Sequence, residues 1–385
     1  MSRNALLSVA VVGLGFGEDF LPIYQAHPDV GEIGIVDTSP ERLHEVGARH
    51  GIEARYTSYE EMLQEDRWDA VHILAPVSFH ADYSIAALDA GKHCACAVPM
   101  ATDLEDLNQI IAAQERSGKN YMMMETTVYS SEFRAIESLY RAGRMGELTL
   151  YHGVHIQNLD GYPPYWLGFP PMHYLTHALS PALQLTQCDV ATVTAVGTGR
   201  LAQTRRSAYD NPFPAEIGLF ELRGSDLVPN VTMSFFQTAR SYIEGFSVYG
   251  ESIGVEWPRS ETDGLRTFEL QALDPNQPTT GLRGRRSTVG TLEPADGLDR
   301  LPAAIQKFVH SYDLVAHDGS GTIRKKAEHG GSHPHLVHEF VSSVVAGRAP
   351  EIDAVRSAAW TAPGICGHQS ALQGGLPVEV PDYRR

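Results

Sequence analysis

Short apolar runs alternate with amphipathic stretches along residues 6–126. This alternation is typical of a parallel sheet whose strands are joined by crossover helices. Two capping pairs, Ser58 with Glu61 and Thr102 with Glu105, mark helix starts between the runs. The pattern therefore predicts an α/β fold with a doubly wound parallel sheet. Its six strands are expected at Leu7–Val12, Glu32–Asp37, Ala54–Thr57, Trp68–Ala75, His93–Pro99 and Asn120–Thr126.

The rhythm changes after Tyr129. A helix over about Ser131–Arg141 leads into long alternating segments, and two helices, about Pro334–Ala346 and Ala354–Gln373, close the chain. Alternation of apolar and polar residues predicts a mainly antiparallel open sheet with one covered face. Its strands are expected at Glu147–Gln157, Asp189–Thr198, Ala215–Leu222, Asn230–Thr238 and Tyr242–Glu251.

These two patterns divide the chain into two predicted domains. Residues 1–128 form a Rossmann domain, and residues 129–385 form an α+β domain that binds substrate and supports oligomerisation. Residues 259–300 are rich in Gly, Pro, Arg and Thr without clear periodicity, which predicts a long loop, an arm or a lid.

Composition limits the kinds of binding partner and the cellular compartment that we expect for the protein. The formal net charge of −17 argues against nucleic acid or an anionic membrane surface as the main partner, because both require a cationic footprint. The 4 cysteines are too few for a disulfide framework, which indicates reduced thiols and a cytoplasmic location. The apolar segment Ala5–Phe16 is short and contains glycines, so we interpret it as a buried strand rather than a targeting segment. No later apolar run is long enough to span a bilayer.

A dinucleotide site is indicated by the glycines that follow the first strand. Gly13, Gly15 and Gly17 stand between a strand and a helix, where backbone amides can approach a pyrophosphate. Asp37 ends the second strand about twenty residues later, at the place where a carboxylate accepts hydrogen bonds from the ribose hydroxyls. The same carboxylate repels a 2′-phosphate, so NAD is favoured over NADP. Glu18 stands where the fingerprint has its third glycine.

The motifs of the whole chain resemble those of one superfamily, that of glucose-fructose oxidoreductase, inositol dehydrogenase and the rhizopine-catabolism enzymes (Gfo/Idh/MocA), whose members are NAD(P)-dependent sugar enzymes. The likeness lies in the glycine loop, in the segments 37–42, 75–80 and 91–99, and in the C-terminal segment 331–336. The fold it implies is the one that the periodicity predicts. The cofactor-binding residues that motif and resemblance imply are Gly13, Gly15, Phe16, Gly17, Asp37, Ala75, Pro76, Ser78, His80, Val98, Pro99, Glu125 and Trp166.

The likeness breaks at the end of the fifth strand. Dehydrogenases of the superfamily carry Glu-Lys-Pro there, and their lysine is the acid/base partner of the hydroxyl being oxidised. This chain has Ala97, Val98 and Pro99 instead. Valine cannot move a proton. Lys92 begins the same strand and is expected to lie roughly 20 Å away.

A second group of acid/base residues follows Pro170 and Pro171. On a helical wheel Tyr174 and His177 project together. This segment resembles the Tyr-Pro-Thr-His-Gly-Leu-Gly-Pro run of the NAD-dependent glycoside hydrolases, a branch of the superfamily that includes bacterial α-N-acetylgalactosaminidases and that also replaces the lysine by valine. The resemblance implies that the catalytic residues are Tyr174, His177, Glu125 and His155.

The branch implies a hydrolysis in which tightly bound NAD is recycled. Hydride leaves C3 of the sugar, a base removes the C2 proton that the ketone acidifies, and the aglycone leaves C1. Water then adds and the hydride returns. Histidine suits the proton steps because its ordinary pKa lies near 6.5. The substrate is a small sugar glycoside whose identity stays open, since Ala97 and Ala178 depart from the branch.

Several alternatives remain beside this interpretation. An NAD-dependent sugar dehydrogenase or ketoreductase could use His177 in place of the lysine, and a non-catalytic NAD-binding sensor would need no lysine. His173 and His177 have the spacing of metal ligands, but no third ligand is evident and we expect no metal. Trp166 stacks on sugar or nicotinamide, or only packs. The open sheet and residues 259–300 favour a homo-oligomer, a dimer or a tetramer.

Overall fold

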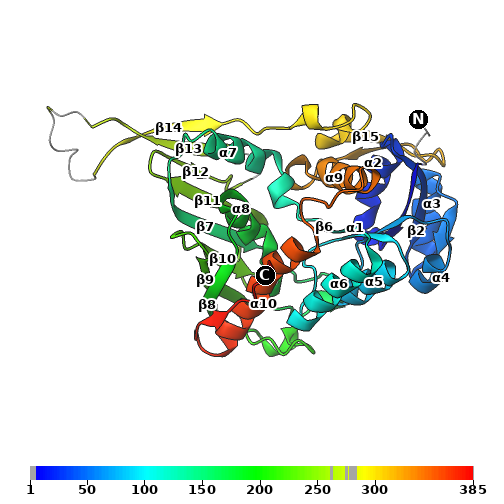
Figure 1. The fold of residues 1–385 in the computed structure, drawn as a ribbon, viewed down its shortest axis with the longest axis horizontal. Helices are drawn as coiled ribbons and strands as arrows, with labels where there is room; N and C mark the ends of the chain where they lie inside the picture. The colour runs from blue at the N-terminus through cyan, green and yellow to red at the C-terminus, as the bar shows by residue number, and fades with distance from the viewer. Residues whose placement is uncertain (1–5, 261–262, 274–275, 277–283, 385) are drawn as a thin grey trace. The chain divides into compact units, whose positions relative to one another are not determined.

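The computed structural model describes residues 6–260, 263–273, 276 and 284–384. They form two units, each shown in chain-order colours in Figure 1. Unit 1 comprises the described residues of 1–129, 297–365 and 382–385, and unit 2 comprises those of 130–296 and 366–381. The segment predicted as a single second domain, 129–385, therefore contributes to both units.

Six parallel strands form the sheet of unit 1, in the order β3-β2-β1-β4-β5-β6. The order reverses between β1 and β4, which is the topological switch point of a doubly wound sheet. The predicted fold class is confirmed. Strands β4, β5 and β6 are shorter than predicted because the chain turns into loops beyond Ile73, Cys96 and Met123. The strands are β1 Leu7–Val12, β2 Val30–Val36, β3 Ala54–Tyr56, β4 Ala70–Ile73, β5 His93–Cys96 and β6 Tyr121–Met123.

Side-chain caps start three of the helices of unit 1. Ser39 and Ser58 each accept a hydrogen bond from a backbone N–H of the first helical turn. The predicted cap at Thr102 is wrong by one residue, because Asp103 accepts the N–H of Glu105. The helices are α1 Leu14–Gly17, α2 Leu21–Ala26, α3 Pro40–His50, α4 Tyr59–Leu63, α5 His80–Asp89, α6 Leu104–Ser117 and α9 His333–Val345, and α10 Ala354–Leu372 belongs to both units.

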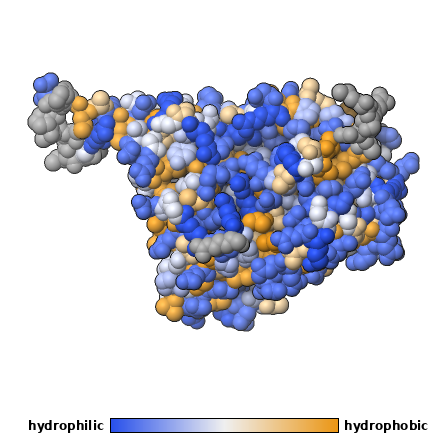
Figure 2. Space-filling model, viewed as in Figure 1, coloured by the Kyte–Doolittle hydropathy of each residue, from blue (hydrophilic) through white to orange (hydrophobic). Residues whose placement is uncertain are grey.

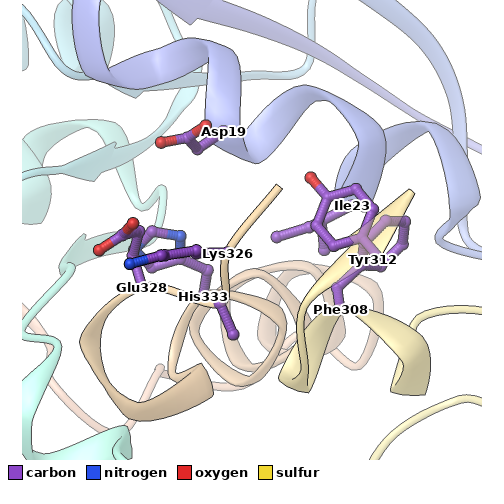
Figure 3. Close-up of a pocket in the computed structure, with 8 residues that line it drawn as sticks. Asp19, Ile23, Phe308, Tyr312, Lys326, Glu328 and His333 are labelled. Atoms are coloured by element: carbon purple, nitrogen blue, oxygen red, sulfur yellow. The ribbon is translucent and has the colours of Figure 1, made fainter. Parts of the chain in front are cut away.

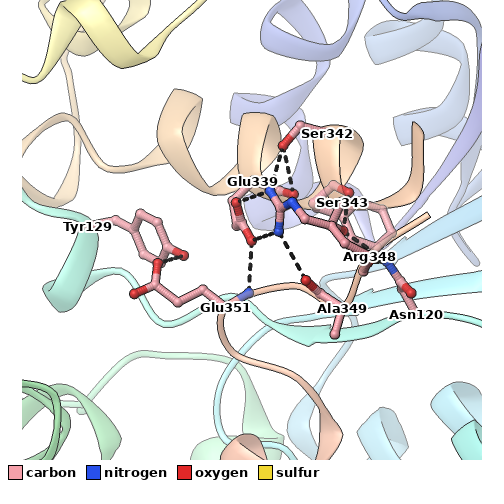
Figure 4. Close-up of polar contacts among 9 residues, drawn as sticks. Asn120, Tyr129, Glu339, Ser342, Ser343, Arg348, Ala349 and Glu351 are labelled. Carbon is pink, nitrogen blue, oxygen red and sulfur yellow. Dashed lines mark hydrogen bonds and ion pairs between the residues drawn. The ribbon is translucent and has the colours of Figure 1, made fainter. Parts of the chain in front are cut away.

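A polar network binds the end of α9 to the rest of unit 1 (Figure 4). The guanidinium of Arg348 donates to both carboxylate oxygens of Glu339 at 2.7 Å, a bidentate geometry. Asn120, next to β6, donates to Ser343 Oγ at 2.9 Å and to the Arg348 carbonyl at 2.8 Å. Tyr129 donates to Glu351 at 3.0 Å. These contacts explain why a segment far along the chain groups with the Rossmann sheet.

The hairpin β15 Tyr312–Val315 with β16 Thr322–Lys325 also lies in unit 1.

A nine-stranded sheet forms unit 2, in the order β14-β13-β12-β11-β7-β10-β9-β8-β17. Every pair is antiparallel except β7 with β10. Helix α8 packs on β7, β10 and β11. The mainly antiparallel sheet is as predicted. Its elements are α7 Ser131–Arg141, β7 Leu148–Ile156, α8 Thr176–Thr186, β8 Val190–Thr198, β9 Ala215–Leu222, β10 Asn230–Ser234, β11 Ile243–Gly250, β12 Ile253–Glu256, β13 Leu265–Leu270, β14 Ser287–Leu292 and β17 Val378–Glu379.

Two strands lie within residues 259–300, where the sequence predicted a long loop, an arm or a lid. The loop alternative is wrong for Leu265–Leu270 and Ser287–Leu292, which pair with each other and extend the sheet from β12. Their side chains are largely exposed on both faces, so no apolar periodicity marked them. Residues 261–262, 274–275 and 277–283 of this segment lie outside the described residues.

The visible surface is mainly polar. Hydrophilic side chains predominate on the face seen in Figure 2, with apolar residues between them. Among the described residues, no helix has the length and the apolar character needed to cross a bilayer.

Candidate active site

The loop after β1 has the backbone that the predicted dinucleotide site needs. Gly13 adopts a φ of +87°, and a Cβ there would lie 2.7 Å from the Leu74 carbonyl oxygen. A Cβ on Gly15 would meet no heavy atom within 4 Å. Gly17 packs against Val11, since its Cβ would lie 3.0 Å from Cγ1 of that residue. Gly13 is therefore required by the fold, while Gly15 leaves open the space that a phosphate would occupy.

Asp37 is held at the end of β2 by the two loops beside it. Its Oδ2 accepts the Leu14 N–H at 2.9 Å, and its Oδ1 accepts the Ser39 N–H at 2.9 Å. Arg42 approaches Oδ2 to 3.3 Å. Each carboxylate oxygen offers about two acceptor positions, so Oδ1 still has one for a ribose hydroxyl. The carboxylate lies beside the glycine loop, as the predicted NAD site requires.

His80 joins the loops that follow β4 and β5. Its Nδ1 lies 2.7 Å from the Pro99 carbonyl oxygen, and its Nε2 lies 3.0 Å from that of Ala75. Carbonyl oxygens only accept, so both ring nitrogens donate and the imidazole is protonated. Burial opposes this charge, but Cys96 and the two carbonyls outweigh it and raise the pKa of His80 to about 8. A buried cation therefore links two of the predicted cofactor-binding loops.

The raised pKa of His80 predicts that the protein loses stability at alkaline pH. A pKa raised from 6.5 to about 8 means that the stabilisation is complete below pH 6.5 and disappears as the pH rises through 8. We expect the free energy of unfolding to fall by about 2 kcal/mol between pH 6.5 and 9. Urea unfolding across this range measures it. His80→Gln should remove the slope, while His44→Gln, at an exposed residue, should keep it; equal slopes in the two variants would contradict the assignment.

Val98, which follows β5, is buried. Lys92, at the other end of the strand, is 4% exposed and donates to the carbonyls of Glu65 at 2.9 Å and Trp68 at 3.0 Å. Lys92 is therefore a structural residue at the amino end of the strand.

Ala75, Pro76 and Ser78, which the resemblance assigns to the cofactor, lie in the segment after β4, where Ser78 belongs to a 3-10 turn.

Glu125 follows β6 in unit 1. Its side chain is completely buried, and its Oε1 accepts the Thr127 N–H at 2.9 Å. Phe16 and His333, also in unit 1, contact each other with ring centroids 5.5 Å apart. His333 in addition stacks on Phe20 at 4.4 Å, and it lines the small pocket drawn in Figure 3. Burial holds the pKa of His333 well below its ordinary value, so the ring is neutral.

Unit 2 brings together three of the four predicted catalytic residues. Tyr174 precedes α8 and His177 lies in its first turn, with ring centroids 5.1 Å apart. His155, on β7, lies 5.7 Å from Tyr174 and 5.6 Å from His177 between centroids. Both histidines are almost completely buried. This triangle, Tyr174–His177–His155, is the acid/base cluster of unit 2.

An aromatic wall borders the acid/base cluster. Trp166, on a 3-10 turn, meets Tyr174 edge-on at 5.4 Å, and Phe235 packs on Tyr174 and His155. Trp166 is therefore placed beside a predicted catalytic residue in unit 2, whereas the other residues predicted to bind the cofactor lie in unit 1.

His173 and His177 have the spacing of metal ligands, but they contact different neighbours. His173 contacts His368 at 5.1 Å between centroids, and His368 in turn lies 2.7 Å from Glu216. Burial, with a contribution from His368, lowers the pKa of His173 to about 3. His177 lies in the acid/base cluster instead. Within the described part of the chain, no group of three or more His, Cys, Asp or Glu side chains has metal-binding geometry.

Sequence reasoning missed Glu244. This residue lies on β11 directly opposite His155, and its Oε1 is 3.7 Å from Nδ1 of His177. Tyr242, two residues earlier, donates its hydroxyl to Glu244 Oε2. The only local signal was the spacing of two, which puts Tyr242 and Glu244 on one face of a strand.

The comparisons with known proteins agree with this geometry. Residues 7–125 match a family model, Gfo/Idh/MocA, described as an oxidoreductase family with an NAD-binding Rossmann fold. Fold, glycine loop and match together define a Rossmann protein whose residues 7–125 are similar to the Gfo/Idh/MocA family. Residues 287–385 match the C-terminal domain of glycosyl hydrolase family 109. The chain is thus similar to Gfo/Idh/MocA proteins in its first part and to glycosyl hydrolase family 109 in its last part, and the predicted resemblance is confirmed.

Similar proteins cover nearly all of the chain. It is 26% identical to a glycosyl hydrolase family 109 protein of Streptomyces coelicolor over 100% of this chain and 84% of that protein. It is 26% identical to an α-N-acetylgalactosaminidase of Shewanella oneidensis over 91% of this chain and 77% of that enzyme. An oxidoreductase from Agrobacterium radiobacter, solved in complex with NAD+, L-tartaric acid and magnesium, has a TM-score of 0.72 at 18% identity, covering 97% of this chain and 98% of that one. This structure shows that the fold is shared.

Proposed function

We propose that this protein is an NAD-dependent glycoside hydrolase that acts on a small sugar glycoside. The observation that carries the proposal is the acid/base cluster of unit 2 in a chain whose fifth strand ends in Val98. A dehydrogenase needs an acid/base group next to the reacting hydroxyl, and Val98 cannot supply one. Tyr174, His177 and His155 provide three groups that can exchange protons. Similarity to glycosyl hydrolase 109 proteins supports the same reaction class.

The residues of unit 1 fit a tightly held dinucleotide. Gly13, Gly15 and Gly17 would hold the pyrophosphate, and Asp37 the adenosine ribose. The open space at Gly15 is the cradle that a Cβ would fill. Bound NAD supplies a hydride acceptor that oxidises one sugar carbon, here proposed as C3, and returns the hydride after the glycosidic bond is broken. NAD is then a recycled cofactor and is not consumed.

The chain's own residues would move the protons. Tyr174 would accept the proton of the sugar hydroxyl during oxidation while passing its own phenol proton to a neighbouring histidine. His177 would remove the proton at C2, so that the electron pair of the C–H bond expels the aglycone from C1. Glu125 or His155 would orient the substrate or protonate the leaving oxygen. Each positioned acid/base group of this kind contributes about 10²–10⁴ in rate.

An assay with aryl glycosides and NAD tests the reaction class. We expect aglycone to be released without net formation of NADH, and deuterium from heavy water to appear at C2 of the product. Binding of NAD, measured by fluorescence titration, is the readout that does not depend on turnover. Stoichiometric NADH would identify a sugar dehydrogenase instead. NAD binding without either product across a broad panel of sugars would favour a sensor.

We also propose that the protein is a cytoplasmic homo-oligomer, a dimer or a tetramer. Supporting the first part, Cys94, Cys96, Cys188 and Cys366 are all free thiols. Exposed apolar residues on the sheet of unit 2 support the oligomer. Val196 on β8 and Ile217 on β9 are directly paired and exposed, and Leu150 and Leu219 on the same sheet are exposed too. Apolar side chains gathered on an open sheet face are typical of an interface between copies. Light scattering gives the mass; a monomer would exclude this part of the proposal.

A further inference from the structure

The carboxylate of Glu244 lies beside the acid/base cluster, 3.7 Å from His177, and takes no part in the proposed proton steps. The sheet register places Glu244 on β11 directly opposite His155 on β7. Residues directly opposite each other in an antiparallel pair project from the same face. Helix α8, which carries His177, packs on both of these strands. Strand pairing and helix packing therefore bring Glu244 close to His155 and His177, although the three residues come from separate parts of the chain.

The distances indicate an electrostatic contact with His177. Glu244 Oε1 lies 3.7 Å from His177 Nδ1, which is beyond hydrogen-bond distance but within ion-pair distance. The Glu244 side chain is 8% exposed and that of His177 is 4% exposed. Little solvent separates or screens the two groups, so the carboxylate acts strongly on any charge that develops on the imidazole.

Tyr242 holds the carboxylate in place. Its hydroxyl donates to Glu244 Oε2, so that Oε1 is the oxygen left toward His177. The Tyr242 ring also packs edge-on against His155, with centroids 5.6 Å apart. His177 is thus approached from three elements, by Glu244 from β11, His155 from β7 and Tyr174 from the turn before α8.

We infer that Glu244 is a positioning residue that orients His177 and stabilises its imidazolium form once His177 has accepted the sugar proton. The carboxylate beside Nδ1 favours a proton on that nitrogen, which leaves Nε2 as the base. When Nε2 takes the proton from carbon, the imidazolium forms next to the Glu244 charge. The proton later returns to solvent or substrate, and Glu244 stays ionised throughout. This inference rests on the proposed function for the step that it serves.

The substitution Glu244→Gln in the full chain tests the inference, because it keeps the shape and removes the charge. We expect kcat to fall about 10–100-fold. The midpoint of the His177 imidazole titration, followed by NMR of histidine-labelled protein, should move down by about one pH unit. The acid limb of the pH profile of kcat should move with it. NAD binding should stay within about twofold, since Glu244 lies in unit 2.

Two further variants complete the experiment. Tyr242→Phe removes only the hydroxyl from a half-exposed residue, and should shift the His177 midpoint in the same direction by a smaller amount. Glu221→Gln, on an exposed carboxylate of the same sheet, should change neither kcat nor the midpoint. An unchanged midpoint and pH profile in both Glu244→Gln and Tyr242→Phe would overturn the inference. The NMR titration needs no turnover, so it decides the role of Glu244 even if no glycoside is hydrolysed and the proposed function fails.

Discussion

Glycoside turnover is expected to fall by about three orders of magnitude when His177 is replaced by glutamine. Glutamine fills a similar volume but cannot accept a proton, so removal of the C2 proton loses its base. His177 lies in the first turn of α8, within 5.1 Å of Tyr174 and 5.6 Å of His155 between ring centroids.

The measurement is steady-state kcat with an aryl glycoside, accompanied by NAD titration and thermal unfolding. NAD affinity should be unchanged because Gly13, Gly15 and Asp37, the residues proposed for the pyrophosphate and the ribose, lie in unit 1. His152→Gln is the matched control, since His152 lies on β7 like His155 but is exposed. A kcat within threefold of the parent in His177→Gln would remove His177 from the mechanism and return the proton step to another group.

The second large effect is expected at Gly13. Gly13→Ala should lower the free energy of unfolding of unit 1 by about 2–4 kcal/mol and abolish NAD binding. The residue has a φ of +87°, where L side chains are strained, and its Cβ would lie 2.7 Å from the Leu74 oxygen and 2.8 Å from the Ala75 nitrogen. Those atoms belong to the chain that follows β4, so the clash cannot be relieved by rotating a side chain.

Gly15→Ala tests NAD binding without a change in the stability of the fold. Its Cβ would meet no heavy atom of the protein within 4 Å, and we expect the free energy of unfolding to change by less than about 0.5 kcal/mol. NAD affinity should nevertheless fall at least tenfold, because the methyl group would occupy the space next to the pyrophosphate. Urea unfolding and NAD titration of both variants measure the contrast. Full NAD affinity in Gly15→Ala would mean that the dinucleotide does not approach this loop.

Local features of unit 1 were predictable because neighbouring residues produce them. Apolar runs locate buried strands wherever both faces of a sheet are covered, so β1 begins and ends where predicted. Gly13 and Asp37 follow strand ends, and parallel strands bring their carboxyl ends to one edge of the sheet. The same reasoning failed for β13 and β14, whose exposed side chains carry no apolar period.

The candidate site in unit 2 was only partly predictable. Tyr174 and His177 are three residues apart, so helical geometry alone puts them together. His173 is equally close in sequence, yet it packs against His368. Glu244 carried no signal beyond alternation with Tyr242, because its partner is chosen by the pairing of β11 with β7 and by the packing of α8.

The sequence by itself determined the class of fold, the glycine loop with Gly13 and Gly15, the position of Asp37 after the second strand, and the absence of a lysine at Val98. These depend on spacing within one element or on residue identity. Only the tertiary structure decided which distant side chains meet. The two carbonyls that keep His80 protonated come from separate loops, and the carboxylate of Glu244 reaches His177 across a sheet. Burial gives these contacts their strength, and burial is a property of the folded chain.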